Sequence, residues 1–351
     1  LEQGVDKLIV TDNGSVDGTR EILEAFAGRG VIDLRHDPVH RKQQSPTVTA
    51  MARDAYKLYG ADWVINADAD EFWVAVDRTT TLHEAFARFP KEYETFTVPV
   101  HDMTGPPAVS GAGLSRLRYR DLRTDAELTR TGMHAHATPD AVHIGCSDIE
   151  VSQGNHFVNR TSKGAPSSAD GVEVLHFPFR SWEQFSRKVG NAGRAYESQT
   201  ELKPSPRHHG MRDYRRLLEG SLKASYIARH PSPDDIEAGL ASGSFVLDET
   251  ISGLHPDADD DALFDDDLIA ELAPLGAAVN ALDLANTDLR QNAIEAETAL
   301  TDALARLRET EAKLATSQEH VSHLEELYAG LKSRRIVRVA DSITEAVRKR
   351  R

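Results

Sequence analysis

The 351-residue sequence contains a single cysteine, Cys146, so it can form neither an internal disulfide nor a metal site built from several thiolates. No apolar run approaches the roughly 18 residues that cross a bilayer, and we expect no signal peptide. Basic residues are in deficit, since 41 Lys and Arg against 56 Asp and Glu give a net charge of −15. This balance argues against nucleic acid as a partner, and the lone cysteine favours a cytoplasmic protein.

Composition divides the chain into parts, and at about 150 residues per domain the length alone predicts two domains. Residues 1–230 mix short apolar runs with Gly, Pro and aromatic residues, as a globular domain does. Residues 231–275 are acidic, with eight Asp or Glu and no Lys or Arg between His255 and Glu271. Like charges at this density repel one another, so we expect a solvated acidic linker.

Residues 276–331 carry a seven-residue repeat and almost no Gly or Pro. One seam consists of Leu282, Leu289, Ala296, Ala303, Thr310, Ser317, Leu324 and Leu331. The second seam, four residues on, consists of Asn286, Ala293, Leu300, Leu307, Leu314, Val321 and Tyr328. A repeat sustained this far predicts a coiled coil and therefore a homo-oligomer, although Ala, Thr and Ser weaken the middle of the first seam. The alternative is a single long helix that lies on the globular domain.

Residues 332–351 reverse the charge, with eight Lys or Arg and two acids. Apolar residues recur among them at near-helical spacing, which predicts a basic amphipathic helix. Such a helix can lie on an anionic membrane surface, so peripheral contact with the inner face of the membrane is one interpretation. A solvated helix end, whose arginines interact only with the helix dipole, is the other.

The first part of the chain alternates strand-like and helix-like segments. Apolar runs at 7–11, 31–34 and 63–67 predict strands, and residues 19–26 and 47–59 have helical periodicity. This alternation predicts a parallel α/β sheet, in which ligands bind beyond the carboxyl ends of the strands. Acidic turns follow the first and third runs, so we expect both turns in one crevice.

Asp68 and Asp70 form the second acidic turn. In an extended segment residues i and i+2 point to the same side, so both carboxylates could face one cation. Oxygen ligands without cysteine favour Mg²⁺ or Mn²⁺, which bind through one or two carboxylates plus substrate phosphates. The alternative is a pair of acids in a solvated turn.

The first acidic turn contains Asp12, Asn13, Ser15 and Asp17 ahead of a helix. Asp12 could accept a hydrogen bond from a base or ribose, while Ser15 or Asp17 could cap the helix. A capped turn without a ligand explains Ser15 and Asp17 well. It explains Asp12 less well, because an acid at a strand end has no capping duty.

These segments carry a family likeness. The runs DNGSVDGT from Asp12, ADWVINADADEF from Ala61 and VLHFPFRS from Val174, with Gly154-Asn155-His156 between them, resemble the family-two-like glycosyltransferases of the GT-A fold. The likeness is closest to the bacterial branch whose metal motif reads Asp-Ala-Asp-Glu-Phe, and it covers roughly residues 1–220. It implies an α/β fold, in which a GT-A (Rossmann-like nucleotide-diphospho-sugar transferase) domain precedes the acidic linker and the α-helical coiled coil.

The resemblance implies a donor-binding set that includes the first acidic turn. Asp12 matches the acid that contacts the nucleotide base, and Asn13 and Asp17 belong to the same block. Arg41 and Lys42 precede the helix that leads to the third strand and could reach phosphate. Solvated loop charges are the equal alternative for these two residues.

The resemblance also implies a metal site. Asp68 and Asp70 match the Asp-x-Asp that holds Mn²⁺ or Mg²⁺ on the donor diphosphate, so Asp68 belongs to the donor site as well. His176 lies where GT-A enzymes often place a late metal or phosphate ligand. A hydrogen-bonded core histidine is the alternative for it. Lys188 flanks the apolar stripe of the helix predicted after His176. Its side chain could point to the site or could lie on the surface.

Two features depart from the family pattern. A GT-A domain opens with a strand and a helix, whereas residues 1–4 resemble only the tail of that helix, with Gly4 as its cap. We therefore expect the opening strand to be missing and the affinity for nucleotide to be reduced. The usual landmark for the catalytic base is also not readable. The candidates for the base are Asp102, Asp148, Glu150 and His156.

The resemblance implies a metal-dependent glycosyltransferase. Such an enzyme would move a sugar from a nucleoside diphosphate sugar, expected to be UDP-linked, to a glycan acceptor or cell-surface polysaccharide precursor, and the family pattern implies inversion at the anomeric carbon. One alternative is a nucleotidyltransferase, although no early Gly-rich basic phosphate loop is visible. The other alternative is a non-catalytic coiled-coil scaffold with a degenerate transferase domain.

Overall fold

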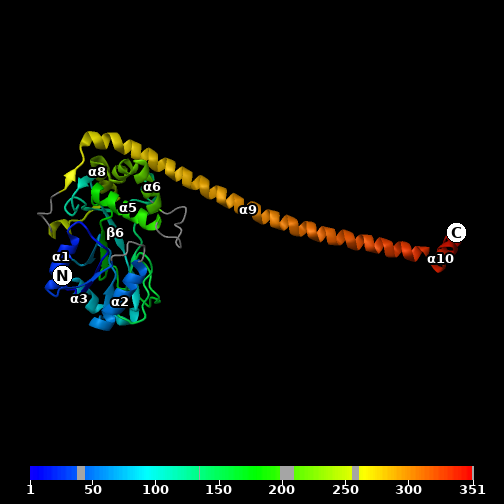
Figure 1. Ribbon diagram of the computed structural model, residues 1–351, viewed down its shortest axis with the longest axis horizontal. Helices are drawn as coiled ribbons and strands as arrows, with labels where there is room; N and C mark the ends of the chain where they lie inside the picture. The colour runs from blue at the N-terminus through cyan, green and yellow to red at the C-terminus, as the bar shows by residue number, and fades with distance from the viewer. Residues whose placement is uncertain (38–43, 134, 198–208, 255–260, 350–351) are drawn as a thin grey trace. The chain divides into compact units, whose positions relative to one another are not determined.

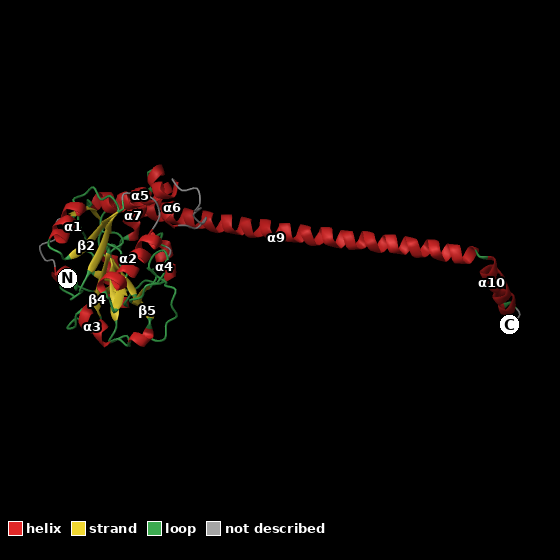
Figure 2. Ribbon diagram, turned by 60° about the horizontal axis from the view of Figure 1, so that its bottom comes forward, coloured by secondary structure: helices red, strands yellow, loops and turns green. Residues whose placement is uncertain are grey.

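The computed structural model describes residues 1–37, 44–133, 135–197, 209–254 and 261–349. The chain is a mixed α/β protein, 53% helical and 15% strand, with a long C-terminal helix. It divides into two compact units, Leu1–Leu284 and Ala285–Arg351. The element order can be followed by colour in Figure 1 and by type of element in Figure 2.

The strands are β1 Leu8–Asp12, β2 Ile32–His36, β3 Trp63–Ile65, β4 Glu71–Ala75, β5 Thr95–Val98, β6 Val100–Thr104, β7 Ala108–Ser110, β8 Tyr119–Asp121, β9 Asp140–Ile144, β10 Val172–His176, β11 Phe245–Leu247 and β12 Ala262–Leu263. The α-helices are α1 Thr19–Gly28, α2 Gln44–Tyr59, α3 Leu82–Arg88, α4 Asp125–Arg130, α5 Trp182–Glu197, α6 His209–Glu219, α7 Leu222–Arg229, α8 Pro233–Ser242, α9 Asp266–Ser333 and α10 Arg335–Arg348. Two short 3₁₀ helices, η1 Lys91–Tyr93 and η2 Ser252–Leu254, complete the described elements.

The sheets are mixed in direction. β1 and β2 pair in parallel, as the sequence predicted. β3, however, pairs antiparallel with β9, which also pairs antiparallel with β5, so β3 does not extend a parallel β1–β2 sheet. The largest sheet has the order β11-β8-β6-β10-β4, and within it only β6 and β10 run parallel. The prediction of one parallel sheet through all three N-terminal strands is therefore wrong.

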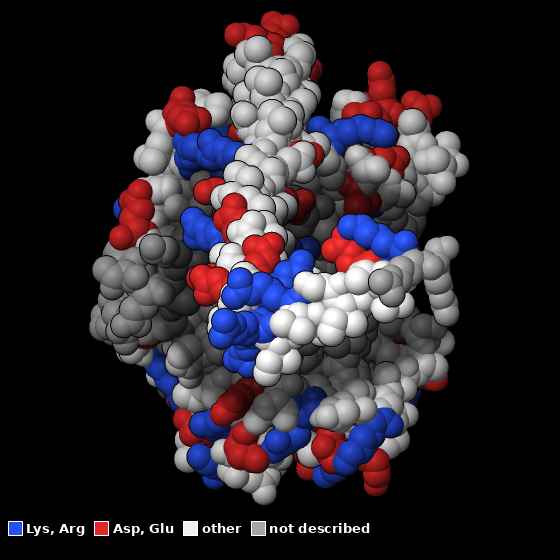
Figure 3. Space-filling view, turned by 90° about the vertical axis from the view of Figure 1, so that its right-hand side faces the viewer, with Lys and Arg blue, Asp and Glu red and all other residues white. Residues whose placement is uncertain are grey.

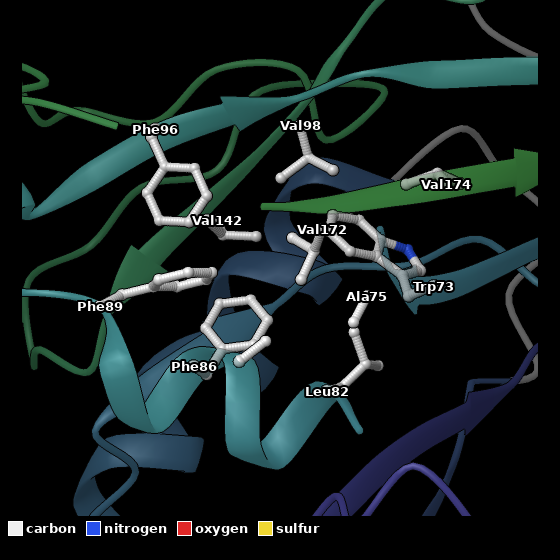
Figure 4. Close-up of a cluster of buried hydrophobic side chains, with 11 residues drawn as sticks. Trp73, Ala75, Leu82, Phe86, Phe89, Phe96, Val98, Val142, Val172 and Val174 are labelled. Carbon is white, nitrogen blue, oxygen red and sulfur yellow. The ribbon is translucent and has the colours of Figure 1, made fainter. Parts of the chain in front are cut away.

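One buried cluster fixes the strands that lead to the second acidic turn (Figure 4). Trp73 of β4 and Val174 of β10 are paired across the two strands and are both buried. α3 covers them with Phe86, and the next residue past its end, Phe89, meets the ring of Phe96 edge-on at 5.4 Å. Large aromatic side chains contribute much of the apolar burial of such a core. The cluster therefore fixes β4 and β10, which begin and end at the site described below.

The segment expected to be a solvated acidic linker is largely folded. α8 begins at a capping box, in which Ser232 and Asp235 satisfy each other's backbone N–H groups. Phe245 and Phe264 are buried, and Asp261 forms a buried ion pair with Arg116 at 3.0 Å. Residues 255–260 lie outside the described part of the chain. The linker prediction is wrong for the rest of 231–275 because apolar residues placed between the acids supply a core.

The long helix α9 begins at Asp266, earlier than the predicted start at 276. Its first turns belong to the globular unit, where Gly276 and Asn280 are buried. Asn280 donates to the Thr131 carbonyl at 2.7 Å and accepts from the Ser225 hydroxyl at 2.7 Å. The helical state predicted for 276–331 is confirmed, and its pairing into a coiled coil stays a prediction.

Within the described residues one helix, α9, contains an 18-residue window apolar enough to cross a membrane by length and composition, with a mean hydropathy of 1.4. About a tenth of that window, 11%, is buried. The expectation that no segment would reach this threshold is therefore not met. One such helix is weak evidence for a membrane span, since core helices of soluble proteins pass the same test.

The basic tail forms α10, which follows a break at Arg334 where the backbone is extended. Figure 3 looks toward the C-terminal end of the chain and shows blue Lys and Arg side chains gathered there. Ile336 and Ile343 of α10 are exposed, at 84% and 59%. The tail is thus a helix with basic and apolar side chains in solvent, and its membrane contact stays a prediction.

Candidate functional site

Asp12 ends β1, and its carboxylate is buried at the start of the first acidic turn. Oδ1 accepts the Ser15 N–H at 3.0 Å, and Oδ2 accepts from Nε and Nη2 of Arg20 at 3.2 and 3.1 Å. Hydrogen bonds from Ser15, together with Arg20, lower the pKa of Asp12 to about 2, so the group is ionised at neutral pH. Asp12 therefore has a structural duty that the sequence argument missed, because it ties α1 to the end of β1.

Asn13 and Asp17 have different neighbours. Asn13 Nδ2 donates to the Asp37 carbonyl at 2.9 Å, just after β2. Asp17 Oδ1 accepts from the Thr19 hydroxyl at 2.7 Å and from the Thr19 N–H at 3.4 Å, at the first turn of α1. Its other oxygen lies 3.1 Å from Arg187 Nη2 of α5. Asp17 thus stabilises the start of α1 and also links this turn to α5.

Asp68 lies in a turn between β3 and β4, closed by a hydrogen bond from the Glu71 N–H to the Asp68 carbonyl at 3.2 Å. The expectation of an extended segment is therefore wrong, and the carboxylates of Asp68 and Asp70 have different neighbours. Asp68 is exposed, and its Oδ1 accepts from Gln44 Nε2 at 2.9 Å and from Asn155 Nδ2 at 3.1 Å. The two amides orient this carboxylate in solvent.

Asp70 immediately precedes β4 and is buried, at 8% exposed. Its Oδ2 lies 2.6 Å from Lys188 Nζ and 3.8 Å from His176 Nε2. Burial alone would raise the pKa of Asp70, but His176 and Lys188 outweigh it and hold the pKa below its usual range. The carboxylate is therefore ionised between two basic side chains.

His176 ends β10 and lies between Asp70 and Asp102. Its Nδ1 is 2.7 Å from Asp102 Oδ1, and Asp102 Oδ2 also accepts the Ala137 N–H at 3.1 Å and lies 3.3 Å from His136 Nδ1. Burial lowers the pKa of His176, but the two carboxylates outweigh it and raise the pKa to about 9. As an imidazolium, His176 suits a phosphate better than a metal, because a metal ligand must give up its proton. The structure brings His176 to Asp70, and its role as a metal or phosphate ligand stays a prediction.

Two adjacent residues of α5 join the two acidic turns. Arg187 reaches Asp17 of the first turn, and Lys188 reaches Asp70 of the second. Phe185 and Val189, on the apolar stripe of α5, pack into a buried cluster, which leaves the side chains of Arg187 and Lys188 half exposed. The structure therefore brings the two turns to one helix, and it places Lys188 at the site rather than on a remote surface.

A second pair of carboxyl groups, Glu71 and Asp140, lies beside Asp68. Glu71 accepts the Asp68 N–H at 3.0 Å, and Asp140 is buried at the start of β9. Burial raises the pKa of both groups, and the nearby charge of Asp140 raises that of Glu71 further. His156 Nδ1 lies 2.9 Å from Asp140 Oδ1. Asn155, which contacts Asp68, has a φ of 64°, a left-handed conformation in which asparagine is enriched.

The four candidates for the base are placed differently. Asp102 is occupied by the hydrogen bonds from His176, His136 and Ala137 described above. The carboxylates of Asp148 and Glu150 are exposed and lie near Arg160 and Arg53. His156 is the remaining candidate, and its block is tied to the second turn through the contact between Asn155 and Asp68.

No group of three or more His, Cys, Asp and Glu side chains in the described part of the chain is arranged to hold a metal ion. A cation that binds together with a diphosphate needs only one or two carboxylates, because phosphate oxygens and water fill its other positions. Asp68 offers an exposed carboxylate oriented by two amides, and Asp70 offers an ionised one. This donor chemistry fits Mg²⁺ or Mn²⁺, provided that Asp70 exchanges Lys188 for the cation.

Arg41 and Lys42, expected to contact phosphate, lie outside the described residues. Three residues that lie at the site were not predicted as site residues from the sequence: Glu71, Asp140 and His136. Glu71 could have been found, because it directly follows the Asp-x-Asp pair. Asp140 and His136 are far from the motifs in sequence and gave no local signal.

Comparison of the chain with protein-family models, with curated proteins and with solved structures finds no match.

Proposed function

We propose that this chain is a metal-dependent glycosyltransferase of the GT-A class, which transfers a sugar from a nucleoside diphosphate sugar to a glycan acceptor. The observation that carries the proposal is the contact of α5 with both acidic turns, through Arg187 to Asp17 and Lys188 to Asp70. A donor of this kind has a nucleoside at one end and a diphosphate beside the reacting sugar. Two acidic turns joined by adjacent cationic side chains match those needs.

The diphosphate would bind at the second turn. Asp68 and Asp70 are the residues that would hold Mn²⁺ or Mg²⁺, and a bound cation would offset the charge that builds on the departing nucleoside diphosphate. Lys188 and the imidazolium of His176 both lie against Asp70. Once Asp70 faces a cation, these two side chains are placed to donate hydrogen bonds to phosphate oxygens. Asp102 would act as a positioning residue, because it holds His176 through Nδ1.

For the acceptor we propose His156 as the general base, with Asp140 orienting it. Asp140 Oδ1 lies 2.9 Å from His156 Nδ1, so the proton on Nδ1 can be held by the carboxylate. This arrangement leaves Nε2 with the lone pair that removes a proton from an acceptor hydroxyl. The ring is half-buried, with 32% of the side chain exposed, so a hydroxyl can reach it.

Calorimetric titration of UDP, GDP, dTDP and CDP into the chain, with and without Mn²⁺, tests the donor site. We expect one nucleotide to bind only with Mn²⁺ and Asp70→Asn to lose that binding. Asp62→Asn is the matched control, because Asp62 is exposed and pairs with Lys91 on the surface. Equal binding by Asp70→Asn and the wild type would disprove the site, and no binding by a chain that circular dichroism shows to be folded would favour a scaffold.

A further inference from the structure

The C-terminal part of α9 presents an apolar stripe to solvent, interrupted at Thr310 and Ser317 of one seam. Leu300, Leu307 and Leu314 of one seam are 59%, 54% and 58% exposed, and Leu324 and Leu331 of the other are each 49% exposed. Leucines repeated at heptad positions along a helix bury this surface when a second helix packs against it. The stripe lies within residues 285–351, which form their own unit.

The charges beside the stripe select an orientation for the partner. With Leu300, Leu307 and Leu314 at position a of the heptad, the g positions include Arg306 and Lys313, which are basic. The e positions include Glu297, Glu311 and Glu325, which are acidic, and Arg290, which is basic. In a parallel pair of identical helices each g position faces the e position of the next heptad on the partner, so Arg306 meets Glu311, while Lys313 faces the uncharged Gln318. In an antiparallel pair g faces g and e faces e, so like charges meet.

Two further residues agree with this orientation. Asn286 occupies an a position, and a single Asn there favours a parallel two-stranded pair in register. Leu304 at e and Leu327 at g are also exposed, at 45% and 52%, and they widen the apolar stripe on its two flanks. Both features suit a second copy of this helix in the same direction.

We propose that residues 286–331 of α9 pair with the same residues of a second copy as a parallel, in-register, two-stranded coiled coil. Arg306 of each chain faces Glu311 of the other. Lys313 is less decisive, because it pairs with Glu309 of its own helix at 2.7 Å. The partner is therefore this chain itself, and the orientation follows from the Arg306–Glu311 pairs and from Asn286 at an a position.

Cysteine cross-linking of the full chain tests the orientation. In a Cys146→Ser background, Ala296→Cys and Ser317→Cys each place one thiol at a d position. A parallel in-register pair brings each thiol against its own copy, so both variants should form a covalent dimer under mild oxidation. An antiparallel pair can join at most one of them to itself. Cross-linking that appears only when the two variants are mixed would overturn the proposal.

Sedimentation of the full chain tests the number of strands and the charge pairs. We expect twice the 38.6 kDa chain mass, and Arg306→Glu should weaken the dimer about tenfold, because two attractive pairs become repulsive. Adding Glu311→Arg should restore it. Arg308→Glu makes the same charge change on the outer face and should leave the dimer unchanged. A monomer or a trimer, or equal effects of the two Arg variants, would contradict the pairing.

Discussion

Lys188 is the residue that occupies the Asp70 carboxylate of the second acidic turn when no ligand is bound. Its ammonium group lies 2.6 Å from Asp70 Oδ2, and half of its side chain is exposed. A cation that binds Oδ2 of Asp70 must replace this contact, so the ion pair and the metal compete at that oxygen. The competition also explains why metal and nucleotide are expected to bind together, since a diphosphate gives Lys188 a new partner.

Replacing Lys188 should therefore strengthen metal binding in the absence of nucleotide. Because Lys188 is half exposed, its ion pair with Asp70 is expected to contribute about 1 kcal/mol, so Lys188→Met should raise the Mn²⁺ affinity about fivefold, measured by electron paramagnetic resonance of free Mn²⁺. The same variant should bind the nucleoside diphosphate more weakly. Lys223→Met is the control, because Lys223 lies over the Trp182 ring. Unchanged Mn²⁺ affinity in Lys188→Met would show that the metal does not displace Lys188 from Oδ2 of Asp70.

Asp140 and His156 provide a separate test, because they would act on the acceptor rather than on the donor. General-base catalysis typically contributes 10²- to 10⁴-fold, so His156→Gln should lower kcat by about 100-fold or more while nucleotide affinity stays within about twofold. Asp140→Asn should also lower kcat, because the amide no longer holds the proton on Nδ1. Glu150→Gln serves as the control. If Glu150→Gln lowered kcat and His156→Gln did not, Glu150 rather than His156 would be the general base.

At the residue scale, local sequence identified the acids of the two turns but not what they contact. Asp68 and Asp70 follow a strand-like run, and that signal is local. Their separate neighbours, Asn155 and Lys188, come from distant parts of the chain. The assumption of an extended backbone failed because one hydrogen bond from the Glu71 N–H closes a turn. Such contacts depend on tertiary packing, which a spacing rule does not contain.

At the scale of elements, periodicity predicted the helices well. The helix expected at 19–26 is found at Thr19–Gly28, and the one expected at 47–59 is found at Gln44–Tyr59. Strand pairing was not predictable in the same way, because β3 pairs with β9, which lies far along the chain. A segment with local strand character does not determine its partner, and the partner decides whether a sheet is parallel.

The acidic segment before α9 shows how charge content misled the prediction at this scale. Phe264 is buried and its ring lies 6.4 Å from that of Tyr226, whereas its neighbour Leu263 is 59% exposed. We expect Phe264→Ala to lower the free energy of unfolding by about 3 kcal/mol. Leu263→Ala should change it by less than about 0.5 kcal/mol. Urea unfolding followed by tryptophan fluorescence measures both free-energy changes. Equal small effects of the two substitutions would support the original prediction of a solvated linker.

At the scale of the whole molecule, the boundary between the two units lies inside α9, after Leu284. Asp283 is just before this boundary, and its carboxylate lies 2.6 Å from Nε of Arg216, which is 1% exposed. Asn280 is buried in the same region. The first turns of α9 are thus part of the globular core, and the first heptad residue, Leu282, still lies within this unit.

Truncation at two positions should separate core from coiled coil. A chain that ends at Leu284 should keep the unfolding midpoint of the full protein while losing self-association in light scattering. A chain that ends at Leu275 removes Asp283 and leaves Arg216 buried with one fewer acidic partner, which should cost about 3 kcal/mol or more. If the shorter chain were as stable as the longer one, the globular unit would not need residues 276–284 of α9.

The adjacency of Arg187 and Lys188 has a consequence for how the chain can vary in length. Successive residues of an α-helix are turned by about 100° about its axis, so the two side chains reach different turns only while Phe185 and Val189 stay buried. Gaining or losing a single residue between Phe185 and Lys188, inside α5, would rotate one side chain away from its acid. Among natural variants of this chain, we therefore expect insertions and deletions to occur outside that interval.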